Sequence, residues 1–294
     1  MIIPVNKPSG YTSHDIVAGL RRAIGGKVKI GHTGTLDPMC TGVLPVLTEN
    51  YTKLSDYFPS NKAYICKICL GIVTDTEDIT GQIFETSDKV VPEDDFVAVL
   101  NSFIGNIDQI PPMYSSIKKN GVPLYKLARK GMQIDREPRK VTVYDIKYNG
   151  PAEDKNSYYF TVYCSAGTYI RTICADIGKK LGCGACMGSL KRIVSNGISI
   201  ERCYDYGALL VLAENGMLGK VAIPFEEAFS HLGKITIPES GRKYYLNGGI
   251  ISPERITGSE LTQENDYIAC SEDGSVLGLA RTNRELFVKS LWNK

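Results

Sequence analysis

Three apolar segments rich in β-branched and aromatic residues constrain the fold of this chain most strongly. They are AYICKICLGIV at residues 63–73, VTVYDIKY at 141–148 and SYYFTVYCSAG at 157–167. Branched and aromatic side chains pack well on a pleated surface, so such segments favour strands over helices. The first segment is apolar almost throughout, which indicates a buried strand. We therefore expect all three segments to be strands.

Amphipathic helices are expected between and around these strands. Apolar residues recur at helical spacing in three segments, from about residue 13 to 24, from about 92 to 103 and from about 168 to 181. Gly25 and Gly26 follow the first segment and are expected to end its helix. Acidic residues at 93–95 favour a helix start there, because negative charge stabilises a helix N-terminus. The segment VKIGH at 28–32 predicts a further short strand.

The sequence pattern changes after Phe229. Short strand-like segments alternate with turn signals such as LNGG, SEDGS and RTNRE, which predicts a small β-rich domain. With 294 residues, the chain is long enough for one large domain and one small one. We therefore predict one domain over residues 1–232 and a second over residues 233–294.

The composition is that of a globular protein. Hydrophobic residues make up 43% of the chain and charged residues 22%. No segment approaches the run of about 18 apolar residues that a membrane helix needs. The start, MIIPVNKPSG, has no basic region followed by a long apolar segment, so we expect a cytoplasmic protein that does not associate with a membrane. Nine scattered cysteines fit reduced thiols better than a disulfide framework.

Two CxxC pairs are the obvious candidates for a metal site. They are CKIC at 66–69 and CGAC at 183–186. Paired CxxC motifs usually bind zinc when about 15 to 20 residues separate them, and here the gap exceeds a hundred. Cys66 and Cys69 also lie in a predicted strand, where their side chains point to opposite faces. We therefore expect no metal site.

A strongly basic segment occupies residues 118–140. It has eight Lys or Arg residues against two acidic ones, a local net charge of +6. Pro123 and Gly131 bracket one short helix within it, in the order expected for helix ends, and the whole segment looks like an insertion over about residues 112–140. Its charge and the aromatic Tyr125 suit a phosphate backbone. Charge alone leaves open the alternative of a solvated surface face.

The stretch GHTGTLDPMCTGVLPV at residues 31–46 places a single charged residue, Asp37, among glycines and prolines. One interpretation is a helix cap, with Asp37 as the cap, Pro38 at the first helical position and Gly42 ending a single turn. The other is a functional carboxylate. Arg171 lies in the first turn of a predicted helix, where a cation is unfavourable to the helix dipole, so we expect it to have a carboxylate partner.

Two more residues have both a structural and a functional interpretation. His32 fits a hydrogen-bonded turn residue as well as a ligand-binding one. Tyr64 alternates with Cys66 and Ile68, and this period of two is typical of a core aromatic on a strand. The residues by themselves therefore indicate a candidate carboxylate with a candidate arginine, no metal and a basic insertion, and they do not identify a reaction.

Six motifs follow one another in order along residues 1–230. They are KPSGYTSHD, GHTGTLDPMCTGVLPV, AYICKICLGIVTDTEDITG, QIPPMYSSIKKNGVPLYKLARKG, CSAGTYIRTICADIG and LGCGACMGSLKR. Together they resemble the bacterial tRNA pseudouridine synthase B family, which isomerises uridine 55 in the T-loop of tRNA. The resemblance implies an α+β catalytic domain, with a mixed, mostly antiparallel sheet flanked by helices. The tail resembles the small PUA-like RNA-binding domain of this family through LNGG and VLGLAR.

The resemblance also implies roles for individual residues. Asp37 matches the catalytic aspartate, and Arg171 matches its partner in the pocket. The other implied substrate-binding residues are His32, which helps to displace the target base, Tyr64, which stacks on the flipped uracil, and the pocket-lining Tyr169 and Leu190. Lys7 and Pro8 match an N-terminal pair that we interpret as mainly structural.

The implied reaction explains why a lone carboxylate suffices. Making pseudouridine breaks the bond from ribose carbon 1' to the base nitrogen, turns the uracil and rejoins it through ring carbon 5. No atoms or electrons are gained or lost, so we expect no metal and no redox cofactor. A guanidinium partner favours the ionised carboxylate that the reaction needs. The target must be flipped out of the stacked T-loop, so the expected partner is the T-arm stem-loop of tRNA, clamped by the basic insertion and bound by a monomer without an obligatory protein partner.

Two other functions remain open at this stage. One is a non-catalytic tRNA-binding or tRNA-folding protein on the same scaffold. The presence of Asp37, Tyr64 and Arg171 together argues against it, because binding alone requires no ionised aspartate facing RNA. The other is a pseudouridine synthase for another RNA. The chain lacks the long charged tails of guide-dependent relatives, which favours stand-alone recognition of tRNA.

Overall fold

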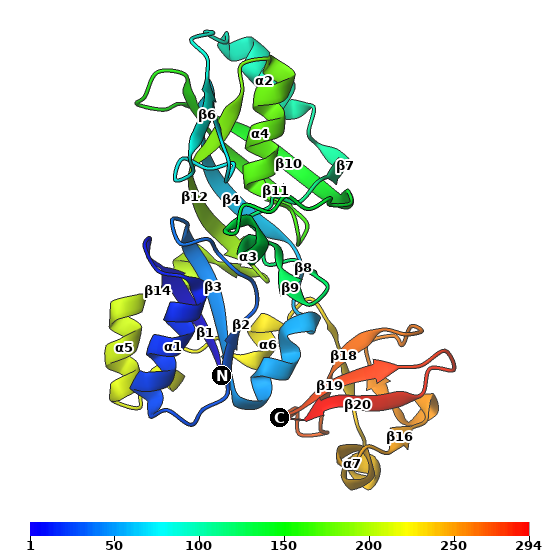
Figure 1. Cartoon of the computed structure of the whole chain (residues 1–294). Helices are drawn as coiled ribbons and strands as arrows, with labels where there is room; N and C mark the ends of the chain where they lie inside the picture. Colours follow the sequence, from blue (N-terminus) through cyan, green and yellow to red (C-terminus); the bar gives the residue numbers. More distant parts are fainter. Residues whose placement is uncertain (294) are drawn as a thin grey trace.

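The computed structural model describes residues 1–293, and over these residues the chain forms a ten-stranded main sheet, a six-stranded second sheet and two small hairpins. The central path of the main sheet is β14 (Tyr204–Asp205), β1 (Ile2–Lys7), β3 (Thr41–Thr48), β12 (Ala185–Ser195), β4 (Lys62–Leu70), β11 (Ser157–Cys164), β10 (Arg139–Pro151) and β7 (Gly105–Gln109), in this spatial order. In addition, β2 (Ile30–His32) pairs with β3, and β13 (Ile198–Ser199) pairs with β12. Figure 1 shows this sheet running through both halves of the elongated molecule.

The main sheet is mixed and mostly antiparallel. Only its β1–β14 and β3–β12 pairs are parallel among the described residues. The parallel β3–β12 pair is short, joining Thr41 to Lys191 and Gly42 to Arg192, and it connects the two halves of the sheet. The α+β class and the sheet type predicted from the family resemblance are therefore confirmed.

The strand predicted over residues 63–73 is two strands. Strand β4 ends at Leu70, and Gly71 then adopts a left-handed φ of +84°. After it, β5 (Ile72–Thr74) leaves the main sheet and forms a hairpin with β6 (Ile83–Thr86). A Cβ atom on Gly71 would lie 2.4 Å from the carbonyl oxygen of Ser87, so the close approach of two chain segments requires glycine here.

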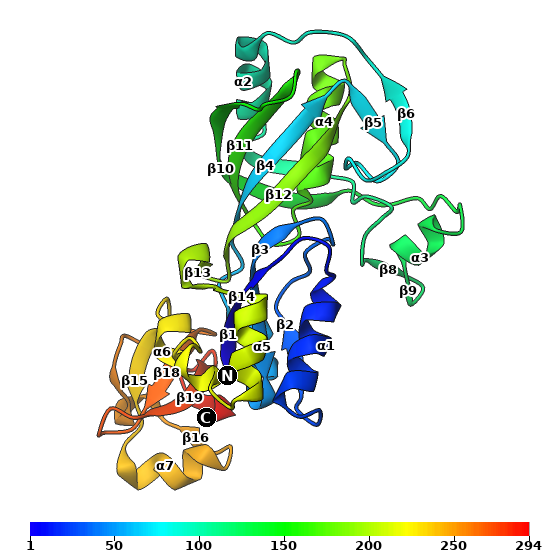
Figure 2. The ribbon, with the colours of Figure 1, turned by 90° about the vertical axis from the view of Figure 1, so that its left-hand side faces the viewer.

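The predicted helices are present, and their ends follow local signals. Helix α1 (Ser13–Ile24) begins after a capping box between Thr12 and Asp15 and ends at Gly25, which has a φ of 109°. Helices α2 (Glu93–Asn101) and α4 (Ile170–Leu181) lie within their predicted segments. Helix α4 packs on β12 and β4, α2 packs on α4 and β10, and α5 (Tyr206–Glu214) packs on α1 (Figure 2). Within residues 1–293, no helix is both long enough and apolar enough to span a membrane.

The basic insertion forms a small unit of its own. It contains a hairpin of β8 (Lys118–Lys119) and β9 (Val122–Pro123), followed by the short helix α3 (Leu124–Ala128). The helix lies between Pro123 and Gly131, as predicted. Figure 2 shows this unit projecting sideways from the main body near the middle of the molecule.

The second sheet begins at Gly233. Its strands, in spatial order, are β16 (Ile250–Ile251), β20 (Val288–Asn293), β19 (Val276–Thr282), β18 (Asp266–Cys270), β15 (Gly233–Thr236) and β17 (Thr257–Gly258), and α7 (Glu239–Leu246) lies beside them. The remaining short elements are α6 (Phe225–Ala228) and the 3-10 helices η1 (Glu49–Tyr57), η2 (Ile200–Arg202), η3 (Leu218–Lys220) and η4 (Pro253–Arg255).

One apolar cluster joins the second sheet to the rest of the chain. The Trp292 ring stacks on Phe225, with 5.3 Å between ring centroids, and its Nε1 donates a hydrogen bond to the carbonyl of Asn50. Ile268 belongs to the same buried cluster as Ile2 of strand β1. The two sheets therefore share a core along this contact, while a separate buried cluster that includes Ile235, Tyr245 and Val288 lies wholly within residues 233–293.

Candidate active site

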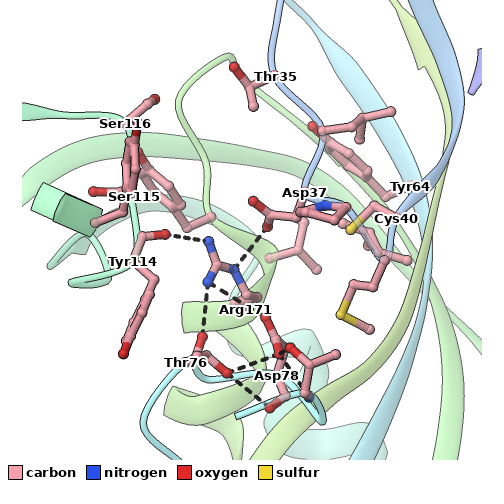
Figure 3. Close-up of a pocket in the computed structure, with 18 of the residues that line it drawn as sticks. Thr35, Asp37, Cys40, Tyr64, Thr76, Asp78, Tyr114, Ser115, Ser116 and Arg171 are labelled. Carbon is pink, nitrogen blue, oxygen red and sulfur yellow. Dashed lines mark hydrogen bonds and ion pairs between the residues drawn. The ribbon is translucent and has the colours of Figure 1, made fainter. Parts of the chain in front are cut away.

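A cavity of about 710 Å³ lies where the halves of the main sheet meet the insertion. Its walls come from the loop at 35–40, strands β4 and β12, the loop at 76–80, the insertion and the start of α4. Of the site residues predicted from the sequence, the structure brings five to this cavity, namely Asp37, Tyr64, Tyr169, Arg171 and Leu190. Figure 3 shows Asp37 and Tyr64 across the cavity from Tyr114 and Ser115.

Arg171 and Asp37 form the expected ion pair. The Nε atom of Arg171 lies 3.1 Å from Oδ2 of Asp37. The other guanidinium nitrogens donate to the carbonyls of Thr76, at 3.0 Å, and Tyr114, at 2.8 Å. Arg171 is only 5% exposed, so these contacts fix the guanidinium beside the carboxylate (Figure 3).

A second carboxylate, Asp78, lies behind this pair, and the sequence analysis missed it. Its Oδ2 is 3.6 Å from Nη1 of Arg171. Its Oδ1 accepts hydrogen bonds from Oγ1 of Thr76 and from the backbone N–H of Thr80, both at 2.9 Å. Asp78 lies in the acidic stretch TDTEDITG, where its spacing differs in no obvious way from that of Asp75. Only the folded chain shows that Asp78 faces the guanidinium.

The surroundings of Asp37 make its carboxylate more basic than usual. The side chain remains 37% accessible through the cavity mouth. Burial raises the pKa of Asp37, and the nearby Asp78 charge raises it further, whereas Arg171 and Lys7 lower it without cancelling the rise. The result is a carboxylate that is held in place by a cation and is a better base or nucleophile than an ordinary aspartate.

The Asp37 loop is held by hydrogen bonds rather than by a helix. The backbone N–H of Cys40 donates to the carbonyl of Asp37 at 3.0 Å, which closes a turn, so the helix-cap interpretation of Asp37 is wrong. Lys7 is fully buried, and its Nζ donates to the carbonyls of Pro38 and Tyr11. Burial lowers the pKa of Lys7 to about 8. These contacts agree with the mainly structural role predicted for Lys7.

Arg192 holds the other end of this loop, and the sequence analysis did not identify it. It is fully buried in β12, where Nε donates to the carbonyl of Val43 at 2.7 Å and Nη2 to that of Gly34 at 3.0 Å. Gly42, with a φ of +104°, lies so close to Arg192 that a Cβ atom would be 2.1 Å from the arginine's carbonyl oxygen. Gly42 thus lets β3 and β12 approach each other.

Tyr64 lies both in the core and at the cavity. It is 6% exposed and belongs to the main apolar cluster, yet it lines the cavity near Asp37. Burial raises the pKa of Tyr64 to about 12, so its phenol stays protonated at neutral pH. Tyr169 is positioned by two hydrogen bonds between its backbone and the side-chain amide of Gln109. Leu190 completes this wall from β12.

His32 lies on β2, outside the lining of the cavity. Burial lowers its pKa, and the nearby charge of Arg192 adds to this effect, which favours a neutral ring. Its Nδ1 is buried and has no hydrogen-bond partner among the described residues. The role of His32 in displacing the target base therefore stays a prediction.

Helix α3 of the insertion forms part of the cavity wall through Tyr125 and Arg129. Four of the exposed cations of the insertion, here called the insertion cations, are Lys118, Lys119, Arg129 and Lys130. None of them makes an ion pair within residues 1–293. They are therefore available to an anionic partner, and Arg129 is available at the cavity itself.

The cysteines lie away from any metal-binding arrangement within residues 1–293. All nine are free thiols. The two CxxC segments meet across β4 and β12, where Cys69 is directly opposite Cys186, while Cys66 contacts Cys174 of α4 with 3.6 Å between the sulfurs. Over the described range, no three His, Cys, Asp or Glu side chains are grouped so that they could hold a metal ion.

Comparison with known sequence families gives two matches. Residues 21–170 match the family described as TruB family pseudouridylate synthase (N terminal domain). Residues 171–230 match the tRNA pseudouridylate synthase B C-terminal domain. The first match ends immediately before Arg171 and includes Asp37 and Tyr64.

Curated relatives align over nearly the whole chain. A tRNA pseudouridine synthase B of Clostridium perfringens (strain 13 / Type A) is 40% identical over 288 residues, which are 97% of this chain and 96% of the relative. A tRNA pseudouridine synthase B of Bacillus subtilis (strain 168) is 38% identical over 288 residues, which are 95% of this chain and 91% of the relative.

Solved structures share the fold over nearly the same length. A chain in the crystal structure of a Cbf5-Nop10-Gar1 complex is 27% identical, with a TM-score of 0.74, and the match covers 97% of this chain and 79% of that one. A chain in a structure of an H/ACA RNP bound to a substrate RNA containing 2'-deoxyuridine is 26% identical, with a TM-score of 0.72, covering 96% and 78% of the two chains.

Proposed function

The chain belongs to the TruB family of pseudouridylate synthases and isomerises uridine to pseudouridine in tRNA, and we propose that its target is uridine 55 of the T-loop and that Asp37 is the catalytic carboxylate. The observation that carries this proposal is the Asp37–Arg171 ion pair, which faces a cavity of about 710 Å³ together with Tyr64. This arrangement places a fixed, accessible carboxylate next to an aromatic face.

The target uridine enters this cavity only after it leaves its stack. A stacked base is out of reach of the Asp37 carboxylate, so the nucleotide is flipped out of the T-loop. The Tyr64 ring then offers a face on which the uracil stacks, while Tyr169 and Leu190 close the pocket around it. His32, on β2 and outside the lining of the cavity, helps to displace the base from the loop.

Asp37 acts on the flipped nucleotide as nucleophile or base. The bond between ribose carbon 1' and the base nitrogen breaks, the uracil turns, and a bond forms between carbon 1' and ring carbon 5. Carbon 5 then loses its proton and the freed nitrogen gains one, so the product is an isomer of the substrate. Arg171 keeps the carboxylate ionised and oriented, because a guanidinium within 4 Å favours the charged form.

The insertion supports recognition of the T-arm. The insertion cations are exposed, and one of them, Arg129, lines the cavity, so they can contact the phosphates of a stem-loop. The PUA-like residues 233–294 extend the RNA-binding surface, in line with the proposed domain division. We place this tRNA-modifying activity in the cytoplasm and propose that a monomer without an obligatory protein partner carries it out.

The test is a comparison of two aspartate variants on tRNA transcripts. Asp37→Asn keeps the size of the side chain but cannot serve as nucleophile or base, so it should bind tRNA and form no pseudouridine. Asp88→Asn changes an exposed aspartate outside the cavity and should behave like the wild type. Mapping of pseudouridine positions should show position 55 for the wild type. Product formation by Asp37→Asn, or modification only at another position, would refute the assignment.

A further inference from the structure

One cation in the cavity wall has no role in the chemistry described above. Lys62, the first residue of β4, lines the cavity together with Asp37 and Tyr64. Its ammonium group makes no ion pair and no hydrogen bond with any residue in the described part of the chain. A partly buried charge without a partner is costly in a free protein, so its presence at a binding site calls for an anion.

The side chain of Lys62 lies against the loop that leads to Asp37. Its Nζ lies 3.1 Å from the point that a Cβ atom on Gly34 would occupy, and Nη1 of Arg192 lies 3.6 Å from the same point. The Arg192 guanidinium is already used, since it donates to backbone carbonyls and is fully buried. Lys62 is therefore the free donor of this cationic pair.

The charges around Lys62 are not those of an internal ion pair. Burial and, to a smaller extent, the positive charge of Arg192 lower the pKa of Lys62 to about 8, and only Cys164 opposes these effects. No carboxylate contributes. An anion with several acceptor oxygens would offset this cost, because hydrogen bonds between charged groups are the strong ones.

We propose that Lys62 binds a backbone phosphate next to the flipped uridine and so fixes the nucleotide along the cavity. This inference rests on the proposed function, because it takes the Asp37 cavity as the place where the target nucleotide is held. A nucleotide flipped into the cavity carries its flanking phosphates to the cavity rim, and those phosphates approach the Asp37 carboxylate. A cation on the β4 side reduces that repulsion and gives the backbone a defined anchor.

The test uses T-arm stem-loops in which one phosphate flanking the target uridine is replaced by a neutral methylphosphonate. Lys62→Met removes the charge and keeps the length of the side chain. It should weaken binding of the unmodified RNA about tenfold or more and reduce the salt dependence by the amount expected for one phosphate contact. When the phosphate that Lys62 contacts is replaced by the methylphosphonate, the affinity of the wild type should fall by the same factor. The affinity of Lys62→Met should not fall any further on this RNA.

Three controls make the result specific. Lys53→Met removes an exposed lysine of η1 outside the cavity and should have no such effect on any RNA. Lys62→Arg keeps the charge and should restore most of the binding. The urea midpoint of Lys62→Met should be no lower than that of the wild type, because the substitution removes a partly buried charge, and this separates lost contact from lost folding. The inference would be overturned if Lys62→Met bound the unmodified and the methylphosphonate RNA more weakly than the wild type by the same factor, or bound both as tightly as the wild type. A wild-type enzyme that converts none of these RNAs would instead count against the proposed function.

Discussion

Replacing Gly42 by alanine should both destabilise the protein and displace the catalytic loop. The backbone at Gly42 has a φ of +104°, and the added Cβ would lie 2.1 Å from the carbonyl oxygen of Arg192. Left-handed strain costs about 1–2 kcal/mol for a non-glycine residue. The clash is with backbone, so it can be relieved only by separating β3 from β12.

The separation sets the size of the effect. It breaks the short parallel pairing of Thr41 and Gly42 with β12 and the hydrogen bond from Arg192 to Val43. Each lost hydrogen bond costs about 1 kcal/mol, so strain and lost bonds together should lower the free energy of unfolding by about 3–5 kcal/mol. That is a large part of the stability of a typical domain, which is about 5–15 kcal/mol. Asp37 lies in the loop that leads into β3, and a displacement of about 1 Å there should slow the reaction about a hundredfold.

Gly31→Ala is the matched control. Gly31 lies in the same stretch of sequence, but its φ is not left-handed and an added Cβ would meet no atom within 4 Å. The same substitution should therefore leave both stability and rate close to those of the wild type. Urea unfolding followed by circular dichroism and single-turnover conversion of tRNA measure the two effects. If Gly42→Ala and Gly31→Ala have the same midpoint and the same rate, the account of the β3–β12 contact is wrong.

Four further predictions concern the cavity and its surroundings. Tyr64→Phe should bind tRNA almost normally because stacking needs only the ring, whereas Tyr64→Leu should lose about 1–3 kcal/mol of stacking together with its rate. Wild-type turnover by the Leu variant would leave Tyr64 as a core aromatic only. Replacing the insertion cations by alanine should weaken tRNA binding and make the affinity less dependent on salt concentration, because fewer counterions are released. An unchanged dependence of affinity on salt would identify the insertion as a solvated face. Because the pKa of Asp37 is raised, activity should fall with decreasing pH at a value above the usual aspartate range of about 4. In pH profiles of kcat/KM, Arg171→Met should move this loss of activity to higher pH, and Arg171→Lys should not. If the loss of activity occurs at the same pH in Arg171→Met as in the wild type, a group other than Asp37 titrates. Trp292→Ala should lower the free energy of unfolding by about 3–5 kcal/mol in urea titrations. The rate of the chemical step at saturating enzyme should stay close to that of the wild type. A large fall of this rate in the folded variant would show that the second sheet supports the cavity directly.

Local patterns in the sequence predicted the helices α1 to α4 and the strands β2, β4, β10 and β11, but not the strands β1, β3 and β12 of the same sheet. The capping signals around α1, the acidic start of α2 and the β-branched runs of β4, β10 and β11 act through neighbours a few residues apart, so they can be read without the fold. The lone charge of the 31–46 stretch made Asp37 a candidate from local sequence, but a helix cap fitted it equally well. The roles assigned to Tyr64, Tyr169 and Leu190 came from the family resemblance rather than from any local pattern.

The tertiary structure decided which side chains meet. Arg171 contacts Thr76, 95 residues away, and Arg192 contacts Val43, 149 residues away. No sequence period reports such contacts, which explains why Asp78, Arg192 and the free cation Lys62 were missed and why the break at Gly71 was not predicted. The shared core around Trp292 likewise depends on side chains from both sheets. Local propensity acts between residues that are a few positions apart, so it determines single helices and strands. The charges and packing of this cavity depend on distant segments that become neighbours only when the sheet has formed.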